Sequence, residues 1–377
     1  MSITTIESIA ATVRDAHRER RTVTPWGAGT HQYLAEAEAD DALRIETAGL
    51  SQIIDYTPAD LTITLEAGVG IGAVQDLLRP NAQWLPWDPP ARPEATIGGL
   101  LACGLSGPLR LAHGTARDRV LGMKVILGDG RVVKSGGRVV KNVAGYDSHK
   151  LHIGAFGTLG IIAEVTFKLA PIPERDEIIA FACPNPAVAL DLADALRQTP
   201  LSPVSLLAQV GVGACVLSAR FSTVAAAVAR QLDVARGRAA QLGAAECAPR
   251  APEPAAFSLP GSGETDLIAR VGVPPAQLRA AVALLAALRP TPELLIYPGV
   301  GLIQLRRAAT PEDPIWLADL RARLLALGGY AVAEHVPVTS GALDRWGPPP
   351  ETVALMRRLK ARWNPHDTLN RGRYIVT

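Results

Sequence analysis

Three glycine-rich segments in the first half of the chain limit what it can fold into. They read TPWGAGT at 24–30, ATIGGLLACGLSG at 95–107 and GAFGTLG at 154–160. Glycine lacks a Cβ atom, so such a backbone can approach an anion or another backbone closely. Each segment adjoins an apolar pattern, which predicts tight loops at the ends of strands or helices.

Strand patterns surround these loops. LTITLEAG at 61–68 alternates apolar and polar residues, which predicts a half-buried strand. LGIIAEVTFKL at 159–169 is expected to place Ile161, Ala163, Val165, Phe167 and Leu169 on one face. VLGMKVIL and RVVKSG flank Gly128-Asp129-Gly130, which predicts a hairpin.

A fourth glycine segment, GVGIGA at 68–73, formally fits the dinucleotide fingerprint GxGxxA. The strand before it carries Thr62, Thr64 and Glu66, whereas a Rossmann strand is apolar on both faces. A tight turn into a helix is therefore the favoured interpretation over a nicotinamide site.

The order of elements after Pro171 and Pro173 is repeated. A strand at EIIAFAC is followed by a helix, a hairpin and an Ala-rich helix opened by Ser222, and the order recurs from DLIARVGV to YAVAEH. This resembles two strand–helix–strand–strand–helix–strand units side by side. Gly-containing hairpins resemble one another anyway, so the repeat stays a hypothesis. The Pro-rich stretch between the two halves predicts a loop. The predicted domains are residues 1–171, 172–335 and a C-terminal segment 336–377 that docks on the first.

Composition excludes several classes of protein. The 377 residues carry 38 basic and 36 acidic side chains, which gives no case for nucleic-acid binding. The apolar run at 280–289 is too short to span a bilayer, and the N-terminus lacks the pattern of a signal peptide. The scattered cysteines Cys103, Cys183, Cys215 and Cys247 predict reduced thiols rather than a zinc or iron–sulfur site. We expect a cytoplasmic protein.

No metal site is expected either. His149 and His152 stand three residues apart on an expected helix, without a matching carboxylate, so a solvated or capping role is favoured.

Two of the glycine loops suit a phosphate. Gly27 and Gly29 follow a proline, and Thr30 and His31 add side-chain donors. Thr96 is expected to cap a helix whose first turn, Ile97-Gly98-Gly99, offers an anion site. Either loop alone is more often an ordinary turn; the two together favour a ligand with a diphosphate.

The ordered set of motifs resembles a known family. TPWGAGT, DPPARPEATIGGLLACGLSGP, HGTARDRVLGMKVILGDGRVV, GGRVVKNVAGYD and GAFGTLGIIAEVTFKLAP are together similar to the FAD-binding domain of the vanillyl-alcohol oxidase and p-cresol methylhydroxylase family. Within that family, the chain resembles the FAD-binding subunit of bacterial glycolate oxidase. The closing LKARWNPHDTLNRGRY is similar to that family's final segment, except that Arg371 replaces a proline.

The resemblance implies an α+β fold, with a two-subdomain FAD-binding domain and an α/β cap of ferredoxin-like units. It also implies which residues line the cofactor: Pro25, Trp26, Gly27, Ala28, Gly29, Thr30, His31, Thr96, Ile97, Gly98, Gly99, Gly104, Gly107, Gly157, Thr158, Gly160, Ile161 and Ile162. Lys141, Asn142, Tyr146 and Asp147 are expected to hold the corner beside the flavin; a helix start with a buried aromatic explains Tyr146 and Asp147 equally well.

The FAD is expected to be non-covalent, because Thr30 stands where covalent relatives often carry a histidine. The implied reaction is oxidation of a 2-hydroxy acid, glycolate to glyoxylate, with a homologous flavin subunit and an iron–sulfur subunit as partners and membrane association only through them. His335 is the one catalytic candidate in the cap, and a structural role fits it better. Two alternatives remain: a stand-alone 2-hydroxy acid dehydrogenase of the lactate type, and a non-catalytic flavoprotein that relays electrons or scaffolds its partner.

Overall fold

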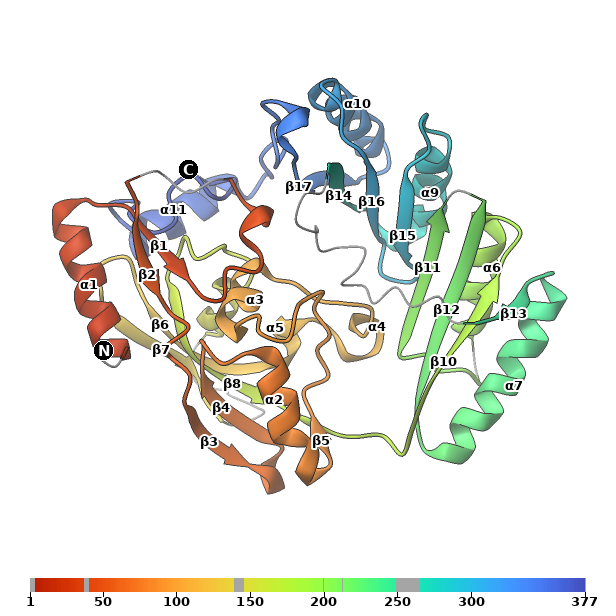
Figure 1. Cartoon of the computed structure of the whole chain (residues 1–377), viewed down its shortest axis with the longest axis horizontal. Coiled ribbons are helices and arrows are strands. Elements are labelled where there is room, and N and C mark those ends of the chain that lie inside the picture. Colours follow the sequence, from red (N-terminus) through yellow and green to blue (C-terminus); the bar gives the residue numbers. More distant parts are fainter. Residues whose placement is uncertain are drawn as a thin grey trace. The chain divides into compact units, whose positions relative to one another are not determined.

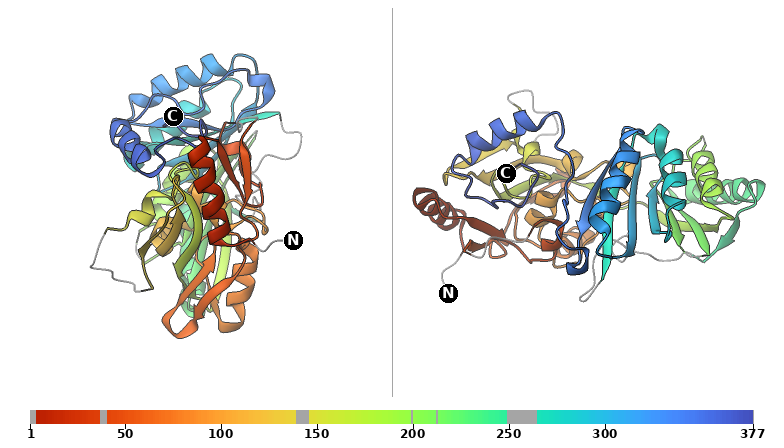
Figure 2. Two further views of the ribbon diagram at one scale, coloured as in Figure 1. Left: turned by 90° about the vertical axis from the view of Figure 1, so that its left-hand side faces the viewer. Right: turned by 90° about the horizontal axis from the view of Figure 1, so that it is seen from above.

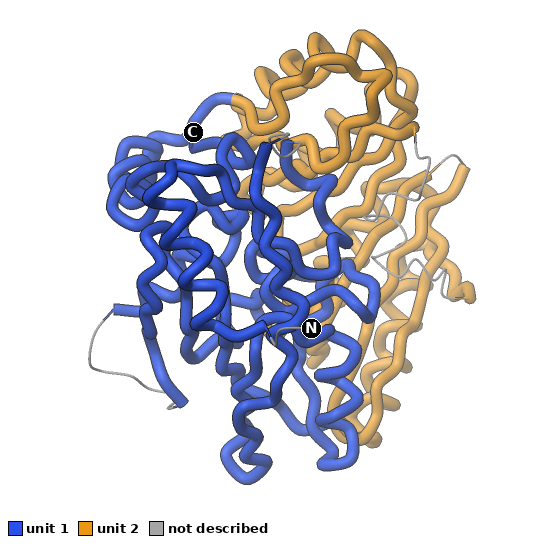
Figure 3. Tube along the Cα trace, turned by 60° about the vertical axis from the view of Figure 1, so that its left-hand side comes forward, with its two compact units in different colours: residues 1–106, 114–172, 348–377 blue, residues 107–113, 173–347 orange. Residues whose placement is uncertain are grey.

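The computed structural model describes residues 4–36, 41–138, 146–198, 200–211, 213–248 and 265–376. Lys141, Asn142 and most of the Pro-rich stretch after Cys247 lie outside these ranges. The chain divides into two units, shown in blue and orange in Figure 3. Unit 1 comprises residues 1–106, 114–172 and 348–377, and unit 2 comprises residues 107–113 and 173–347.

Unit 1 is built on a five-stranded antiparallel sheet. Its order is β3 (Ile53–Thr57), β4 (Thr62–Glu66), β8 (Ile161–Lys168), β6 (Val120–Ile126) and β7 (Val132–Gly136). β6 and β7 form the predicted hairpin, with Ile126 opposite Val132. Both neighbours of β4 are antiparallel to it, which contradicts a Rossmann βαβ unit at residues 68–73.

One helix and a pair of short strands lie around this sheet. Helix α1 (Ile6–Glu19) runs alongside the strands, as Figure 2 shows, and packs Ile9 and Val13 against Ala163. β1 (Val23–Trp26) and β2 (Leu43–Glu46) form a parallel pair. The unit also contains α2 (Ile71–Leu78), β5 (Gln83–Trp84), α3 (Ile97–Cys103), α5 (Ala116–Arg119), β9 (Ala170–Pro171) and α11 (Val353–Trp363), with 3₁₀ turns between them.

Two strand predictions in this unit are corrected. All five residues of β4 are buried, so the strand is not half-buried: Thr64 Oγ1 lies 2.9 Å from Thr166 Oγ1, and Glu66 accepts a hydrogen bond from the Gln52 N–H. The register between β6 and β8 shifts at Lys124 and Val125, so Ile161 and Ala163 join a different apolar cluster from Val165 and Phe167. A bulge reverses which face a side chain takes.

Unit 2 has the repeated layout. The first half contains β10 (Arg175–Ala182), α6 (Pro186–Leu196), β11 (Ser205–Gly211), β12 (Ala214–Thr223), α7 (Ala225–Gln241) and β13 (Ala245–Cys247). The second half contains β14 (Asp266–Gly272), α9 (Leu278–Ala286), β15 (Glu293–Tyr297), β16 (Leu302–Ala308), α10 (Asp313–Leu325) and β17 (Tyr330–His335). The short helix α4 (Arg110–His113) also belongs to this unit and contacts β11.

The eight strands of unit 2 form one antiparallel sheet in the order β13-β10-β12-β11-β15-β16-β14-β17. The second half mirrors the first about the contact between β11 and β15, seen in Figure 1. Helices of both halves cover one face, and their apolar core includes the fully buried Phe181 and Phe221. Truncating such a residue to alanine costs about 3–5 kcal/mol. The predicted fold class, an α+β domain with an α/β cap of ferredoxin-like units, is confirmed.

The C-terminal segment lies against unit 1. The Val23 N–H donates to the Thr368 carbonyl at 2.8 Å, and the Asn370 N–H donates to the Val23 carbonyl at 2.9 Å. These bonds extend β1 on its other side and bring residues 370–373 beside the first glycine loop. Among the described residues, no helix is both long and apolar enough to cross a bilayer.

Candidate functional site

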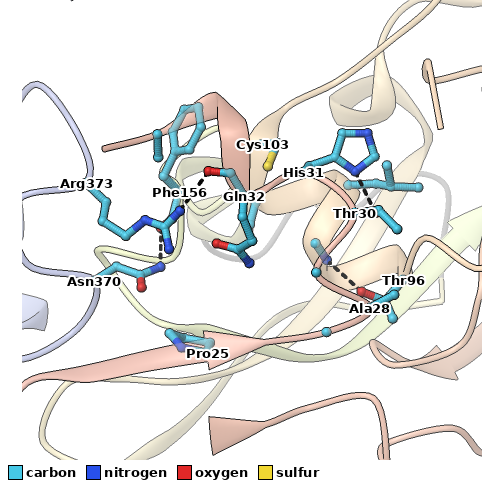
Figure 4. Close-up of a pocket in the computed structure, with 16 residues that line it drawn as sticks. Pro25, Ala28, Thr30, His31, Gln32, Thr96, Cys103, Phe156, Asn370 and Arg373 are labelled. Carbon is cyan, nitrogen blue, oxygen red and sulfur yellow. Dashed lines mark hydrogen bonds between the residues drawn. The ribbon is translucent and has the colours of Figure 1, made fainter. Parts of the chain in front are cut away.

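A pocket in unit 1 forms where β1 ends and the first glycine loop begins (Figure 4). Eight of the residues expected to bind the cofactor line it: Pro25, Gly27, Ala28, Gly29, Thr30, His31, Thr96 and Gly99. None of the described residues that line it is acidic. The pocket is therefore compatible with an anionic group.

The loop from Gly27 to His31 exposes backbone donors. In the part of the chain that the structure describes, none of the five N–H groups of residues 27–31 donates a hydrogen bond. Gly29 has a φ of +69°, a conformation that glycine adopts without strain. Consecutive N–H groups left free in this way form an anion-binding concavity.

His31 is held neutral at the edge of this loop. Its Nε2 lies 2.9 Å from the Pro90 carbonyl, which can only accept, so Nε2 carries the proton. Its Nδ1 then accepts from the Thr30 hydroxyl at 2.8 Å. Burial lowers the pKa of His31 below its ordinary value, and the hydrogen bond to Pro90 offsets only part of this decrease. Thr30 and His31 thus fix one another, and both ring nitrogens are engaged.

The C-terminal segment supplies two side chains to the pocket, as Figure 4 shows. Asn370 Nδ2 donates to the Phe156 carbonyl at 2.7 Å, and its buried Oδ1 has no partner among the described residues. Arg373 is buried and donates to the Gln32 carbonyl at 3.1 Å. The sequence prediction missed both residues, although the family-like motif LNRGRY contains them.

The start of α3 does not provide the donors that its glycines suggest. Thr96 caps the helix as predicted, accepting from the Gly99 N–H at 3.4 Å. However, the Ile97 N–H donates to the Val69 carbonyl at 2.9 Å, and the Gly98 N–H donates to the Ala67 carbonyl at 2.7 Å. The first turn of α3 is therefore already satisfied by protein, which corrects the expectation of an anion site there.

The other expected residues do not line this pocket. The Trp26 ring lies 3.7 Å beneath the Arg44 guanidinium, and Gly104 ends α3 with a left-handed φ of +67°. Ile161 and Ile162 are in β8, with their side chains in apolar clusters. Also outside the pocket lining are Ile97, Gly98, Gly107, Gly157, Thr158 and Gly160, and Gly107 belongs to unit 2.

The remaining candidates have structural contacts. His335 Nδ1 lies 2.8 Å from the Asp266 carbonyl, which ties β17 to β14. His149 and His152 lie in and after a short 3₁₀ turn, not an α-helix, and His152 stacks on Trp363 at 4.8 Å. Tyr146 is almost fully exposed and Asp147 pairs with Lys150 at 2.9 Å, so the structure does not support a buried aromatic at this corner. Across the described ranges, no group of three or more potential metal ligands occurs.

Comparison with known proteins gives this pocket a chemical context. Residues 1–136 match the family described as FAD binding domain. The glycolate oxidase subunit GlcE of Escherichia coli is 43% identical over 122 residues, which cover 32% of this chain and 35% of that protein. A probable mitochondrial D-lactate dehydrogenase of Danio rerio is 30% identical over 230 residues, which cover 59% of this chain and 45% of that protein. The matched segments thus span less than half the length of these relatives.

A solved structure resembles the whole chain. An alkyldihydroxyacetonephosphate synthase superposes with a TM-score of 0.70 at 16% identity, covering 97% of this chain and 74% of that one. At this identity the likeness concerns the fold alone.

The residues of the pocket fit a part of FAD. Its volume is about 80 Å³, less than the ~300–1,000 Å³ of a site that buries a whole ligand, so it suits a fragment such as the diphosphate. The free N–H groups of residues 27–31 and the Arg373 guanidinium suit the phosphate charge, and Asn370 Oδ1 suits a hydroxyl or amino group. Residues 1–136 match an FAD binding domain, in agreement with this fit, and FAD is the cofactor.

Proposed function

We propose that this chain is the FAD-binding subunit of a multi-subunit glycolate oxidase, which oxidises the 2-hydroxy acid glycolate to glyoxylate. The observation that carries the proposal is the row of free backbone N–H groups at Gly27–His31, in a chain similar to the glycolate oxidase subunits GlcE of Escherichia coli and GlcD of Bacillus subtilis. The partners proposed are a homologous flavin subunit and an iron–sulfur subunit, in a cytoplasmic complex whose membrane association, where it occurs, is through these partners.

The residues of the chain bind and orient the cofactor in this proposal. The N–H groups of Gly27–His31 hold the diphosphate, and Arg373 offsets its charge. The Thr30 hydroxyl donates to Nδ1 of the neutral His31 ring, and this hydrogen bond restrains the loop. Bound FAD would supply the hydride-accepting ring.

The structural role of His335 favours a reaction that requires a partner subunit. Oxidation of a hydroxy acid requires a base for the hydroxyl proton and a cation for the carboxylate. The Nδ1 of His335 is used in a bond to the Asp266 carbonyl at 2.8 Å, as expected of a structural residue. We therefore expect the isolated chain to bind FAD and to oxidise glycolate poorly.

The alternative is a stand-alone 2-hydroxy acid dehydrogenase. Relatives named D-lactate dehydrogenase and D-2-hydroxyglutarate dehydrogenase, 30–32% identical over about half of the chain, favour it. Glycolate-dependent and D-lactate-dependent dye reduction should be measured on the FAD-loaded chain, alone and after mixing with its co-purifying partners. The proposal predicts glycolate activity only in the mixture. Full activity of the chain alone, abolished by His335→Ala, would reverse it.

We also propose that the FAD is bound without a covalent link. Covalent attachment through His31 would need a free ring nitrogen, and both nitrogens of His31 are hydrogen-bonded. Acid precipitation should release all of the flavin into the supernatant. Flavin that stays in the washed protein pellet would contradict this.

A further inference from the structure

Two free cysteines lie opposite each other in the first half of unit 2. Cys183 directly follows β10, and Cys215 is the second residue of β12. The ladder between these strands ends with Ala182 opposite Val216, and the Cys183 N–H donates to the Cys215 carbonyl at 2.8 Å. The two cysteines are therefore the next cross-strand pair of the same ladder.

Their side chains lie on the same face of the sheet. Both belong to the apolar cluster that contains Phe181 and Leu217, which stand two residues away on the respective strands. Cys183 Sγ lies 3.6 Å from the Phe181 carbonyl, on the strand that pairs with the one carrying Cys215. The two cysteines therefore face the same apolar core from directly opposed positions.

A disulfide fits between residues placed in this way. Directly opposed residues of a hydrogen-bonded antiparallel pair have Cα atoms about 5.5 Å apart, within the roughly 4.4–6.8 Å that a disulfide spans. The other two cysteines differ. Cys247 in β13 is opposite Ala180, and Cys103 lies in α3 of unit 1. They serve as internal controls.

The thiols are not equivalent. The hydrogen bond from Cys215 lowers the pKa of Cys183, and the same bond together with burial raises the pKa of Cys215. The thiolate is the reactive form of cysteine, so Cys183 is the better nucleophile. Both residues are largely buried, with 8% of each residue's surface exposed.

We propose that Cys183 and Cys215 are a redox modification site, which hydrogen peroxide converts to a disulfide. The Cys183 thiolate attacks one oxygen of the peroxide, so that an S–O bond forms, the O–O bond breaks, and hydroxide leaves and takes up a proton to become water. Cys215 gives up its proton and its sulfur displaces the hydroxyl of this sulfenic acid as a second water. Two thiols are oxidised and one peroxide is reduced to two waters. A dithiol reverses the modification.

The test uses the full chain with FAD bound. It is treated with stoichiometric peroxide, denatured in an alkylating reagent and mapped by mass spectrometry without reduction. The result expected is a single cross-linked peptide pair containing Cys183 and Cys215, which disappears after treatment with dithiothreitol. The same product is expected in the variant Cys103→Ser/Cys247→Ser.

Two further measurements test the order of the reaction and the effect of the disulfide on stability. In Cys215→Ser, a sulfenic acid on Cys183 should be trapped by dimedone, because the resolving thiol is missing. The midpoint of chemical unfolding should rise on oxidation and return on reduction, since the bond restricts the unfolded chain. Independent sulfinic acids on Cys183 and Cys215, or free Cys183 and Cys215 thiols under conditions that oxidise Cys103, would overturn the proposal.

Discussion

The two glycine loops that meet in the pocket of unit 1 look alike in sequence and differ in structure. At Gly27–His31, the backbone N–H groups donate no hydrogen bond within the described part of the chain. At Ile97–Gly99, each N–H already donates to protein, to Val69, Ala67 and Thr96 respectively. Only the first loop is free to bind a phosphate.

This difference shows that the glycines of the second loop have a packing role. A Cβ atom on Gly98 would lie 2.9 Å from the Cβ of Ala67, so this glycine allows α3 to pack closely against the segment after β4. A Cβ atom on Gly27 would lie 2.2 Å from Thr96 Oγ1. The second loop thus packs against the first and supports it. A glycine-rich helix start can serve packing rather than binding.

Gly29→Val should have the largest effect. The new side chain would meet the Trp26 ring, at 2.8 Å for its Cβ alone, and would be forced into a positive φ. Backbone strain costs about 1–3 kcal/mol, and each displaced N–H to a charged phosphate a further ~1.5–3 kcal/mol. We expect FAD affinity to fall by more than about 100-fold, measured by fluorescence titration.

Gly98→Ala is the matched change in the other loop. It should lower the free energy of unfolding through crowding against Ala67, and leave FAD affinity within a few-fold of the unaltered chain. If Gly98→Ala lost FAD as severely as Gly29→Val while remaining folded, the distinction between the two loops would fail.

Sequence alone predicted the fold well because its patterns are local. The β6–β7 hairpin around Gly128–Gly130 and the repeated order of strands and helices in unit 2 both depend on neighbouring residues. The burial of the polar face of β4 could not be predicted in this way. Thr64 and Glu66 are satisfied by Thr166 and Gln52, and those contacts exist only after the strands pair.

The same distinction applies to the site: the part formed by one local segment was predicted, and the part that depends on contacts between segments was not. The family-like loop at residues 25–31 was identifiable from its own glycines. Whether Ile97 and Gly98 keep free N–H groups depends on the carbonyls of Val69 and Ala67, which belong to a different segment. Arg373 joins the pocket only because the C-terminal segment pairs with β1.

His152, a buried histidine outside the pocket lining, should affect the pH dependence of the unfolding free energy without affecting FAD affinity. Burial lowers the pKa of His152 from 6.5 to about 4, and His149 adds to this. The unfolded chain then binds more protons between these pH values, so stability is full above pH 6.5 and decreases as the pH falls toward 4. His152 accounts for about 3 kcal/mol of that loss.

His152→Phe keeps a ring beside Trp363 and removes the titrating group. Urea unfolding should show an acid loss about 3 kcal/mol smaller in this variant, with FAD affinity at neutral pH unchanged. An identical acid loss in variant and parent would contradict the assignment.

Arg373→Gln should weaken FAD binding without changing the loop itself. A charge-assisted hydrogen bond to phosphate contributes about 1.5–3 kcal/mol, so affinity should fall roughly 10–100-fold. Arg371→Gln is the control, because Arg371 is in the same segment but outside the pocket lining, 3.7 Å from Asp367. Equal losses in both variants would point to the segment's overall charge.

Thr96→Ala should have the smallest effect. It removes the side-chain cap of α3, which costs about 1 kcal/mol of unfolding free energy. Because the helix start binds no phosphate in this account, FAD affinity should change by no more than a few-fold. A loss comparable to that of Arg373→Gln would show that this end of α3 takes part in binding.

Amide hydrogen exchange with and without FAD tests the central claim most directly, resolved residue by residue by NMR. Before FAD is added, the amides of residues 27–31 should exchange rapidly and those of Ile97 and Gly98 slowly, because only the latter are hydrogen-bonded. FAD should slow exchange at residues 27–31 and leave Ile97 and Gly98 unchanged. Unchanged rapid exchange at Gly27–His31 with FAD bound, together with new protection at the start of α3, would contradict the account.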